Sequence, residues 1–457
     1  MRTDLAVIGA GPAGLAAALA AAAYGLRVTI LDAAPAPGGQ FYRQPAAGLR
    51  AGRPQALHHQ WRTWERLRDA LAACDAEILT DHHVWAVECG FTVHALHGPG
   101  RQESAAVRAE AVLLATGGYE KVLPFPGWTL PGVVTAGGAQ AMLKSALVVP
   151  GRRAVVAGTG PLLLPVATGL AAAGAEVAAL VESADPKAFV RHIRALAAKA
   201  PEGAGYAARL LRHRIRFLAR HTVVRAHGEH TLTGVTVAAL DSGGRVRPGS
   251  ERHIPCDTLA VGHGMLPHTD LAESLGCRLD GHTVRVDGEQ RTDVPGVWAA
   301  GEATGIGGAT LALAEGHIAG RSIAARLRSR EPDPREWTAA ATVRGRLRTV
   351  ARGMDAVYSP PPSWTEQITD DTVVCRCEEV TAASVRRAVG ELGAGDLRTV
   401  KLLTRAGMGW CQGRMCAPAV AGVAGCELTS STRPFARPVP LGVLARQHED
   451  TTEEGAS

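Results

Sequence analysis

The sequence has little lysine and few aromatic residues. Only five of its 457 residues are lysine, although Lys and Arg together number 49, and Phe, Trp and Tyr make up 4%. The net charge of +6 is modest for this length, and no basic run is interleaved with aromatic residues, as nucleic-acid binding would require. The composition therefore argues against a nucleic-acid partner. With 46% hydrophobic and 20% charged residues, it fits a soluble protein of two or three domains.

The sequence also lacks a recognisable export signal and a membrane-spanning segment. Residues 5–26 are apolar, but Asp4 precedes them and Arg2 is the one basic residue before the run. Glycines and Pro12 interrupt the run, whereas an export signal joins a basic start to a continuous apolar core. We therefore expect a cytoplasmic protein without a transmembrane segment, whose association with a membrane, if any, is through a complex.

Nine cysteines are present, and they fall into two groups. Five are scattered as single residues, a pattern typical of small buried side chains: Cys74, Cys89, Cys256, Cys277 and Cys426. The other four lie close together near the C-terminus. In a reducing compartment, clustered cysteines indicate metal binding before disulfide formation.

A dinucleotide-binding motif opens the chain. Residues 5–8 form an apolar run typical of a buried parallel strand, and Gly9, Gly11 and Gly14 follow at G-x-G-x-x-G spacing. In this motif the first glycine allows a tight turn, the second admits the pyrophosphate, and the third lets the helix lie close to the strand. Asp32 follows 23 residues after Gly9 and can bond a ribose hydroxyl. The residues predicted to bind the dinucleotide here are Gly9, Gly11, Pro12, Ala13, Gly14 and Asp32.

The same pattern begins again after residue 151. A strand over residues 153–157 is followed by Gly158, Gly160 and a helix, and the next strand ends in Glu182. Leu163 stands where the third glycine belongs, so the helix cannot approach the strand as closely, which counts against NAD(P). We predict a second nucleotide-binding unit at Gly158, Gly160 and Glu182. Three occupants stay open for it: NAD(P), an ATP-like nucleotide, or none.

Two further motifs give residues 1–327 a specific resemblance. An apolar strand over residues 111–114 enters the turn Ala115-Thr116-Gly117, and residues 295–302 read Pro-Gly-Val-Trp-Ala-Ala-Gly-Glu. Together with the opening glycines, these motifs occur in the order seen in two-dinucleotide flavoprotein reductases, which this part of the chain resembles. The fold class expected from the resemblance is α/β, with two Rossmann-like dinucleotide-binding domains.

The resemblance implies FAD as the first cofactor. Glu302 would bond the ribityl chain of FAD, and the amides of Gly308 and Ala309, at a helix N-terminus, would face the N1/O2 edge of the flavin. A turn-rich loop at residues 35–40 would bring more backbone to the first phosphate site. The additional residues predicted to bind the cofactor are Gly39, Gln40, Ala115, Thr116, Gly117, Gly301, Glu302, Gly308 and Ala309.

One departure from this family bears on activity. Thioredoxin reductases and their relatives carry a Cys-x-x-Cys pair in the first or the second domain. The corresponding residues here, 39–42 and 135–140, contain no cysteine. Disulfide reduction is therefore excluded.

The four C-terminal cysteines form two pairs. Cys375-x-Cys377 is followed after 33 residues by Cys411-x4-Cys416, and we predict that all four bind one metal centre. Zinc and a [2Fe–2S] cluster are the rival occupants, but structural zinc sites favour Cys-x-x-Cys knuckles, and neither pair has that spacing. Nearby cations would favour a reduced cluster: Arg376, Lys401, Arg405 and Arg414.

The surrounding stretch resembles the [2Fe–2S] domain of bacterioferritin-associated ferredoxin (BFD), whose cysteine pattern it matches. Within it we predict a helix over residues 382–392, a strand over 397–404 and a turn at 406–409. The whole chain is then divided into an FAD-binding domain (1–120 and 256–327), a second nucleotide domain (121–255), a linker with one short helix (328–370), a small α+β BFD-like domain (371–430), and a Pro-rich arm with a disordered tail (431–457). The arm is expected to pack back on the body of the protein.

Nearly the full length is similar to one group of flavoproteins: the FAD-binding subunits of opine oxidase, hydroxyproline or proline dehydrogenase, and hydrogen cyanide synthase. Residues 38–40, 125–128 and 406–414 carry this similarity. It implies a partner that is itself a flavoprotein like D-amino-acid oxidase and holds a small amino- or imino-acid substrate. This chain would relay electrons through FAD and the cluster to an acceptor such as a quinone, and the sequence singles out no catalytic residue of its own.

Two other functions stay open at this point. A self-sufficient NAD(P)H-dependent reductase would use the second domain to feed hydride to FAD, and Leu163 argues against it. A non-enzymatic assembly protein would have vestigial cofactor sites, although every expected FAD and cluster position is filled.

Overall fold

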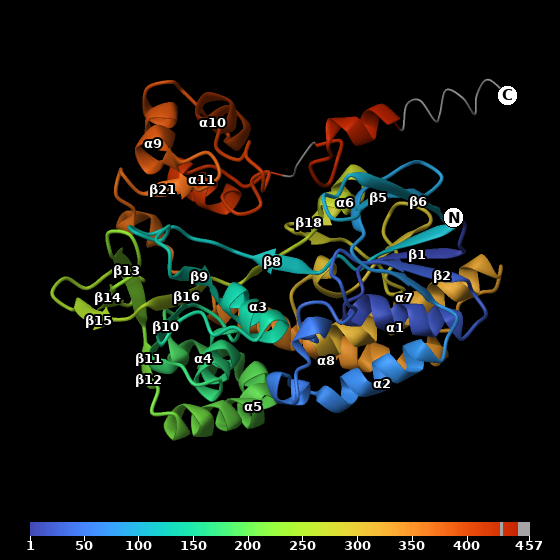
Figure 1. The fold of residues 1–457 in the computed structure, drawn as a ribbon, viewed down its shortest axis with the longest axis horizontal. Helices are drawn as coiled ribbons and strands as arrows, with labels where there is room; N and C mark the ends of the chain where they lie inside the picture. The colour runs from blue at the N-terminus through green and yellow to red at the C-terminus, as the bar shows by residue number, and fades with distance from the viewer. Residues whose placement is uncertain (430–432, 447–457) are drawn as a thin grey trace.

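The computed structural model describes residues 1–429 and 433–446, and its first half is built on a five-stranded parallel sheet (Figure 1). The strand order is β20-β7-β1-β2-β3. The strands are β1 (Leu5–Ile8), β2 (Val28–Leu31), β3 (Glu77–Leu79), β7 (Ala111–Leu114) and β20 (Val297–Ala299). Four of these, all but β3, are buried at every residue, as expected for parallel strands covered on both faces.

Alternate residues of this sheet point into two different cores. Leu5 and Val7 face the helices α1 (Pro12–Ala22), α2 (Trp61–Ala72) and α7 (Ala309–Leu327). Ala6 and Ile8 face the antiparallel sheet formed by β4 (His83–Val87), β5 (Thr92–His97) and β6 (Glu103–Arg108), together with α6 (Asp270–Ser274). Short elements near this half are η1 (Ala47–Leu49), η2 (Pro54–Leu57), β18 (Leu279–Asp280), β19 (Thr283–Val284), η4 (Gly301–Thr304) and η5 (Pro334–Trp337).

The second half repeats this architecture. Its parallel sheet has the order β12-β11-β10-β16-β9, with β9 (Val133–Thr135), β10 (Arg153–Gly158), β11 (Glu176–Glu182), β12 (Arg216–Ala219) and β16 (Thr258–Gly262). One face packs on α3 (Ala136–Ala146) and α4 (Leu163–Ala172). The other packs on the antiparallel strands β13 (His221–His227), β14 (Gly234–Ala239) and β15 (Arg252–Pro255). The predicted α/β fold with two Rossmann-like units is confirmed.

The chain crosses between the two halves along a pair of antiparallel strands. It leaves the first half through β8 (Gly118–Glu120) and returns through β17 (Met265–Pro267), and the two strands pair with each other. The second half also contains η3 (Pro186–His192) and α5 (Ile193–Arg212), which precede β12. Figure 1 shows β8 running between the two halves.

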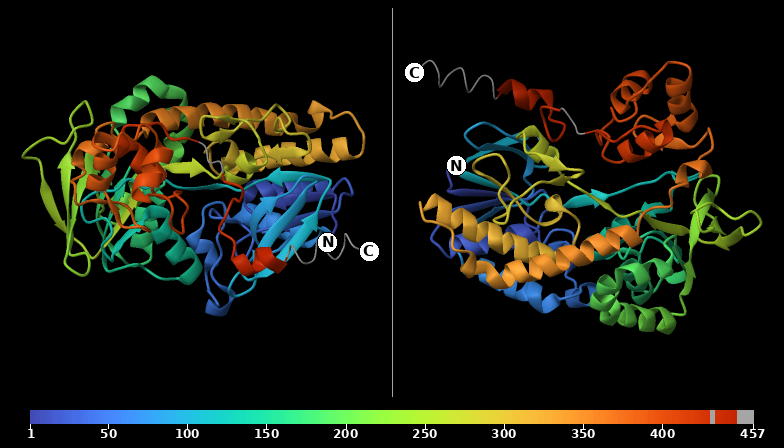
Figure 2. Two further views of the ribbon diagram at one scale, coloured as in Figure 1. Left: turned by 90° about the horizontal axis from the view of Figure 1, so that it is seen from above. Right: turned by 180° about the vertical axis from the view of Figure 1, so that it is seen from behind.

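Residues 328–370 are more ordered than the expected linker with one short helix. They contain η6 (Trp364–Gln367) and the twenty-residue helix α8 (Thr338–Val357), which packs against α7 of the first half and α5 of the second (Figure 2). The expectation of a short helix was wrong because the many arginines mask an apolar stripe. This stripe, with four- and three-residue spacing, consists of Val343, Leu347, Val350, Met354 and Val357.

The C-terminal region folds as a small domain above the second half (Figure 1). It contains β21 (Val373–Cys375), β22 (Val380–Thr381), α9 (Ala382–Gly390), α10 (Leu397–Thr404) and α11 (Ala417–Ala424) around its own core. The helix predicted over residues 382–392 is confirmed. The strand predicted over 397–404 is wrong, because Asp396 caps this segment as helix α10 by accepting a hydrogen bond from the Thr399 amide at 2.9 Å.

The arm that follows this domain packs back on the first half, as expected. Ala436 is buried and donates its amide to the Trp85 carbonyl at 2.8 Å, and Val443 is buried against Trp85 and Leu96. The predicted disordered tail lies outside the described residues.

Across the part of the chain that the structure describes, every helix is too short or too polar to cross a bilayer.

Candidate functional site

The turn between β1 and α1 has the geometry of a phosphate-binding site. Gly9 adopts a φ of +110°, and a Cβ there would lie 2.3 Å from the Ala115 carbonyl oxygen. A Cβ on Gly14 would lie 1.9 Å from the Gly9 carbonyl oxygen, so only glycine lets α1 approach β1 this closely. A Cβ on Gly11 would meet no atom within 4 Å, so this residue faces open space at the N-terminus of α1. A pyrophosphate can approach the backbone there.

Asp32 is held beside this turn at the end of β2. Its carboxylate accepts hydrogen bonds from the amides of Ala10, at 2.5 Å, and Ala34, at 2.7 Å. Burial raises the pKa of the Asp32 carboxyl, and these two N–H donors act in the opposite direction. Gly39, at φ +59°, lies over the turn, because a Cβ there would be 2.9 Å from the Gly11 Cα. The adjacent Gln40 is exposed, and its side-chain oxygen accepts a hydrogen bond from Arg43 at 2.7 Å.

The residues predicted to hold the flavin end line the same side of the sheet. Thr116 donates its hydroxyl to the His268 carbonyl at 2.6 Å, which fixes the turn at the end of β7. Glu302 is half-buried, and burial raises the pKa of its carboxyl. Among the described residues, no hydrogen bond reaches that carboxylate, so a ribityl hydroxyl would supply a missing donor. Gly308, at φ +83°, has open space where a Cβ would stand, at the start of α7.

Helix α7 lies directly on α1 through glycines that sequence reasoning missed. A Cβ on Gly316 would lie 2.0 Å from the Ala13 carbonyl oxygen, and one on Gly320 would lie 2.3 Å from the Ala17 carbonyl oxygen. The available signal was the four-residue spacing of small residues along this helix. The contact fixes the N-terminus of α7 relative to the phosphate-binding turn, so both ends of a bound FAD would meet a rigid frame.

A buried ion pair braces the loop between β20 and α7, and it too was not predicted. Glu315 of α7 is 1% exposed and accepts hydrogen bonds from the Gly301 amide at 3.0 Å and the Thr304 hydroxyl at 2.9 Å. Arg348 of α8 donates to Glu315 at 2.8 Å and to the Gly305 carbonyl at 2.9 Å. Helix α8 therefore holds the Gly301–Gly308 loop in place from outside the predicted FAD-binding residues.

Replacing Arg348 with methionine should loosen this loop. The change leaves Glu315 buried without its cationic partner, and breaking a buried pair costs about 3–5 kcal/mol. We expect a lower unfolding temperature and weaker FAD retention, measured by thermal unfolding and by flavin absorbance per mole of protein. Arg346→Met, on the exposed side of the same helix, is the matched control and should change neither.

The second nucleotide-binding unit has a turn similar to that of the first. Gly160 faces open space as Gly11 does, while Leu163 in the first turn of α4 is 1% exposed. Glu182 accepts hydrogen bonds from the amides of Gly160, at 3.1 Å, and Ala184, at 2.9 Å. Glu182 is 6% exposed. Burial raises the pKa of the neighbouring Tyr358 to about 12, and the negative charge of Glu182 adds to this effect.

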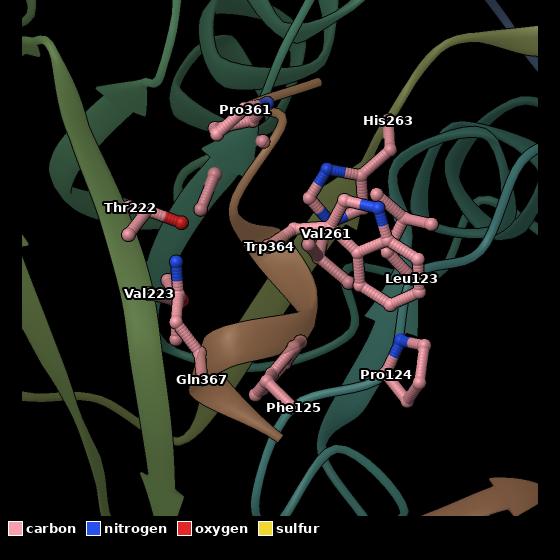
Figure 3. Close-up of a pocket in the computed structure, with 12 residues that line it drawn as sticks. Leu123, Pro124, Phe125, Thr222, Val223, Val261, His263, Pro361, Trp364 and Gln367 are labelled. Carbon is pink, nitrogen blue, oxygen red and sulfur yellow. The ribbon is translucent and has the colours of Figure 1, made fainter. Parts of the chain in front are cut away.

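Residues after α8 line a small pocket at the ends of β10 and β16. Trp364, Pro361 and Gln367, from the segment after α8, line it together with Leu123, Phe125, Gly158 and His263 (Figure 3). The space left is about 20 Å³, room for about one water molecule. Open α/β sheets bind their ligands at this edge, and residues 361–367, which were predicted to belong to a linker, lie beside it in this chain.

Glu182 should make stability depend on pH in a defined window. Burial raises its pKa from 4.5 to about 7, so the stabilisation that its protonated form provides is complete below about pH 4.5 and is lost as the pH rises through 7. In thermal unfolding, Glu182→Gln should lack the decline that the wild type shows between these values. Glu176→Gln, an exposed position on the same strand, should keep it.

The two cysteine pairs meet in the small domain. The Cys411 thiol contacts those of Cys416 and Cys377, and the Cys416 thiol contacts that of Cys375. The Gly407 amide points at the Cys375 sulfur at 3.5 Å. Glycines permit this approach, because a Cβ on Gly409 would lie 2.4 Å from the Cys377 Cβ. Four soft sulfur donors in contact suit zinc or an iron–sulfur cluster.

Protonation in this site is strongly uneven. The Cys416 thiol, as a hydrogen-bond donor, lowers the pKa of Cys411 to about 5, and the same contact raises the pKa of Cys416 well above its usual range. Four thiolates this close repel one another, so a cationic centre has to balance them. Four cysteine thiolates can hold either one zinc ion or a [2Fe–2S] cluster, but neither pair here has the Cys-x-x-Cys spacing that structural zinc sites favour.

Of the remaining cysteines, Cys256 and Cys277 are buried as expected, whereas Cys89 is exposed and Cys74 and Cys426 are half-buried. Cys89 therefore corrects the expectation of five buried single cysteines. It lies in the turn between β4 and β5, where its side chain meets solvent.

Comparison with known proteins agrees with this geometry. Residues 3–317 match the family described as pyridine nucleotide-disulphide oxidoreductase, and residues 373–423 match the BFD-like [2Fe-2S] binding domain. The opine oxidase A-subunit of Agrobacterium tumefaciens is 33% identical and covers 91% of this chain and 84% of its own length. The HcnB protein of hydrogen cyanide synthase from Pseudomonas aeruginosa is 35% identical and covers 90% of each.

Among solved structures, the L-proline dehydrogenase from P. horikoshii has the same fold. It superposes with a TM-score of 0.68 at 21% identity and covers 98% of this chain and 80% of its own. The matched families indicate FAD and a [2Fe–2S] cluster as cofactors, and the four clustered cysteines lie within the second match. The chain is thus an FAD-dependent oxidoreductase that belongs to the pyridine nucleotide-disulphide oxidoreductase family and carries a C-terminal BFD-like [2Fe–2S] binding domain.

Proposed function

We propose that this chain is the FAD/[2Fe–2S] electron-transfer component of a multi-subunit amino- or imino-acid dehydrogenase. The observation that carries the proposal is the narrow crevice of the second nucleotide domain, lined by Trp364, beside a flavin-binding fold and a four-cysteine site. Trp364 beside the crevice at β10 and β16 and Leu163 in place of the third glycine both count against reduction of the flavin by NAD(P)H. Electrons would then come from another protein of the complex.

The curated relatives support a partner protein. The matching chains of opine oxidase and sarcosine oxidase, an A-subunit and an alpha-subunit, are by name parts of larger enzymes. We propose that the partner here is a flavoprotein like D-amino-acid oxidase. It would bind a small amino or imino acid of the opine, hydroxyproline, proline or glycine type and take hydride from the carbon next to nitrogen.

The two cofactors of this chain would divide the electrons. FAD, when bound, accepts two electrons and the cluster carries one, so together they convert hydride chemistry into single-electron delivery to a quinone or another acceptor. The residues of this chain bind and orient these groups. Glu302 and the amides at Gly308 and Ala309 would hold the flavin, and Cys375, Cys377, Cys411 and Cys416 would hold the irons.

We propose that this protein is cytoplasmic and that any association with a membrane is through its complex. All nine cysteines, which lie within the described residues, are free thiols, and four of them would be metal ligands that an oxidising compartment does not favour.

We also propose that the division into domains follows the limits predicted from the sequence. Helix α8 is the exception, because it packs on both halves.

Two measurements test the proposal. Co-expression with a D-amino-acid-oxidase-like partner should give a complex that copurifies and reduces a dye in the presence of proline, hydroxyproline or an opine. Anaerobic NADH or NADPH added to the isolated chain should leave the flavin absorbance unchanged. Rapid bleaching by either nucleotide would contradict the proposal and favour a self-sufficient NAD(P)H-dependent reductase.

A further inference from the structure

A partly buried ion pair joins the cluster loop to the flavin-binding half. Arg414 lies in the loop between Cys411 and Cys416, and it donates two hydrogen bonds to Asp270 of α6, at 3.1 and 2.9 Å. The side chains are 18% and 13% exposed. Paired N–H donors on one carboxylate fix orientation as well as distance, so this contact sets how the cluster loop faces the first half.

The same carboxylate connects to the predicted flavin turn. His268 has its Nε2 3.0 Å from Asp270, and its backbone carbonyl accepts the Thr116 hydroxyl at 2.6 Å. The His268 amide in turn donates to the Gly117 carbonyl at 2.9 Å. Two residues of the Ala115-Thr116-Gly117 turn are thus bonded to the residue that contacts Asp270.

On the other side the path reaches a cluster ligand. Arg414 donates a third hydrogen bond to the Cys411 carbonyl at 3.2 Å. Arg433 also lies 3.7 Å from Asp270. Burial raises the pKa of the Asp270 carboxyl, but its contacts with His268 and Arg414 outweigh this effect and hold that pKa well below its usual range. A continuous series of contacts therefore runs from Thr116 to Cys411, across 295 positions of sequence.

We propose that this junction, consisting of Thr116, His268, Asp270, Arg414 and Cys411, positions the cluster against the flavin and is the route of electron transfer between them. The inference rests on the proposed relay function and names the path within it. FAD, when bound, would give one electron at a time to the cluster held by Cys411 and its three partner cysteines, one iron going from ferric to ferrous and a flavin proton going to solvent. The cluster would pass that electron to the quinone or other acceptor before it takes the second.

A second contact between the small domain and the body offers a comparison. Trp128 of the second half donates its indole N–H to the Val373 carbonyl at 2.7 Å. This bond also ties the domain down, but it reaches neither the flavin turn nor the Cys411 loop. If the junction carries electrons in addition to holding the small domain in place, loss of the Arg414–Asp270 contact should slow electron transfer and loss of the Trp128–Val373 contact should not.

The test uses Asp270→Asn and Trp128→Phe in the purified full chain with both cofactors. Illumination with EDTA reduces the flavin directly, so no partner protein is needed, and the signal of the reduced cluster is followed by electron paramagnetic resonance. Asp270→Asn should slow cluster reduction roughly tenfold or more, because small displacements of reacting centres have large effects on rate. Trp128→Phe should leave the rate unchanged.

Hydrogen exchange supplies a readout that does not depend on turnover. Asp270→Asn should raise exchange in residues 406–416, and Trp128→Phe should raise it only near residue 373. The proposal is overturned if Asp270→Asn transfers electrons at the wild-type rate, if Trp128→Phe slows transfer equally, or if wild-type flavin fails to reduce the cluster in light. The light-driven experiment uses no partner protein. Failure of the flavin to reduce the cluster would therefore be distinguishable from failure of this chain to copurify with a partner.

A second variant covers loss of the cluster in the first. Should Asp270→Asn purify without iron, Arg414→Lys replaces it, since lysine keeps the charge and removes the fork that bonds both carboxylate oxygens. Slow cluster reduction is again expected, and a wild-type rate would again overturn the proposal.

Discussion

Gly11→Ala should give a protein that folds normally and binds little FAD. The backbone at Gly11 is extended, with φ −76°, a conformation that alanine adopts freely, and the added methyl group would touch no protein atom within 4 Å. The methyl group would instead fill the open space where the pyrophosphate approaches the turn. We expect FAD affinity to fall roughly 100-fold, about 2.8 kcal/mol. Flavin fluorescence titration of the apoprotein measures the affinity, and thermal unfolding of the apoprotein checks the fold.

Gly14→Ala is the contrasting variant. Its methyl group would stand 1.9 Å from the Gly9 carbonyl oxygen and 3.1 Å from the Val7 side chain, so α1 would have to move off the sheet. This variant should lose FAD and also unfold at a lower temperature without cofactor. Gly48→Ala, in open space within η1, should change neither property. A Gly11→Ala protein that keeps its full flavin content would show that the cofactor does not lie on this turn.

Cys416→Ser should remove the iron–sulfur cluster and leave the flavin in place. Serine oxygen is a poor ligand for iron at a site built from thiolates, and Cys416 contacts both Cys411 and Cys375. The small domain has its own core, separate from the cores around the first sheet, so damage there should not reach the FAD site. Iron and acid-labile sulfide should fall almost to zero while flavin per mole of protein stays constant.

Two other cysteines provide matched controls. Cys426 lies in the same small domain, after α11, and Cys89 is exposed in the first half. Serine at either position should leave iron, sulfide and flavin unchanged. Zinc without sulfide in the wild type, or an intact cluster in Cys416→Ser, would contradict the assignment of these ligands.

The parts of the fold that local sequence patterns encode were predictable. The glycine-and-acid pattern occurs twice, and each copy forms the first crossover of a parallel sheet. Segment 397–404 was misassigned because a short apolar run fits strand and helix equally well. Asp396 before the run was the overlooked sign of a helix start. For α8, the apolar stripe was present in the sequence but was hidden by arginine content.

The contacts missed at the site have no local pattern. Arg348 and Glu315 are 33 positions apart, and Arg414 and Asp270 are 144 apart, so each pair exists only after the chain has folded. Trp364 likewise reads as part of a Pro-rich connection until the structure brings it to the end of β10. Single-sequence reasoning finds motifs whose function depends on spacing, and it misses partners that the tertiary fold supplies.

Helix α8 has a mechanical consequence for the whole molecule. Because one helix without an internal proline packs on α7 of the first half and α5 of the second, swivelling one half against the other would have to bend it or tear it away. A flavin bound in the first half would therefore be held in a fixed orientation relative to the second half. Redox partners would then reach it by docking on the outer surface of the protein, without rotation of one half against the other.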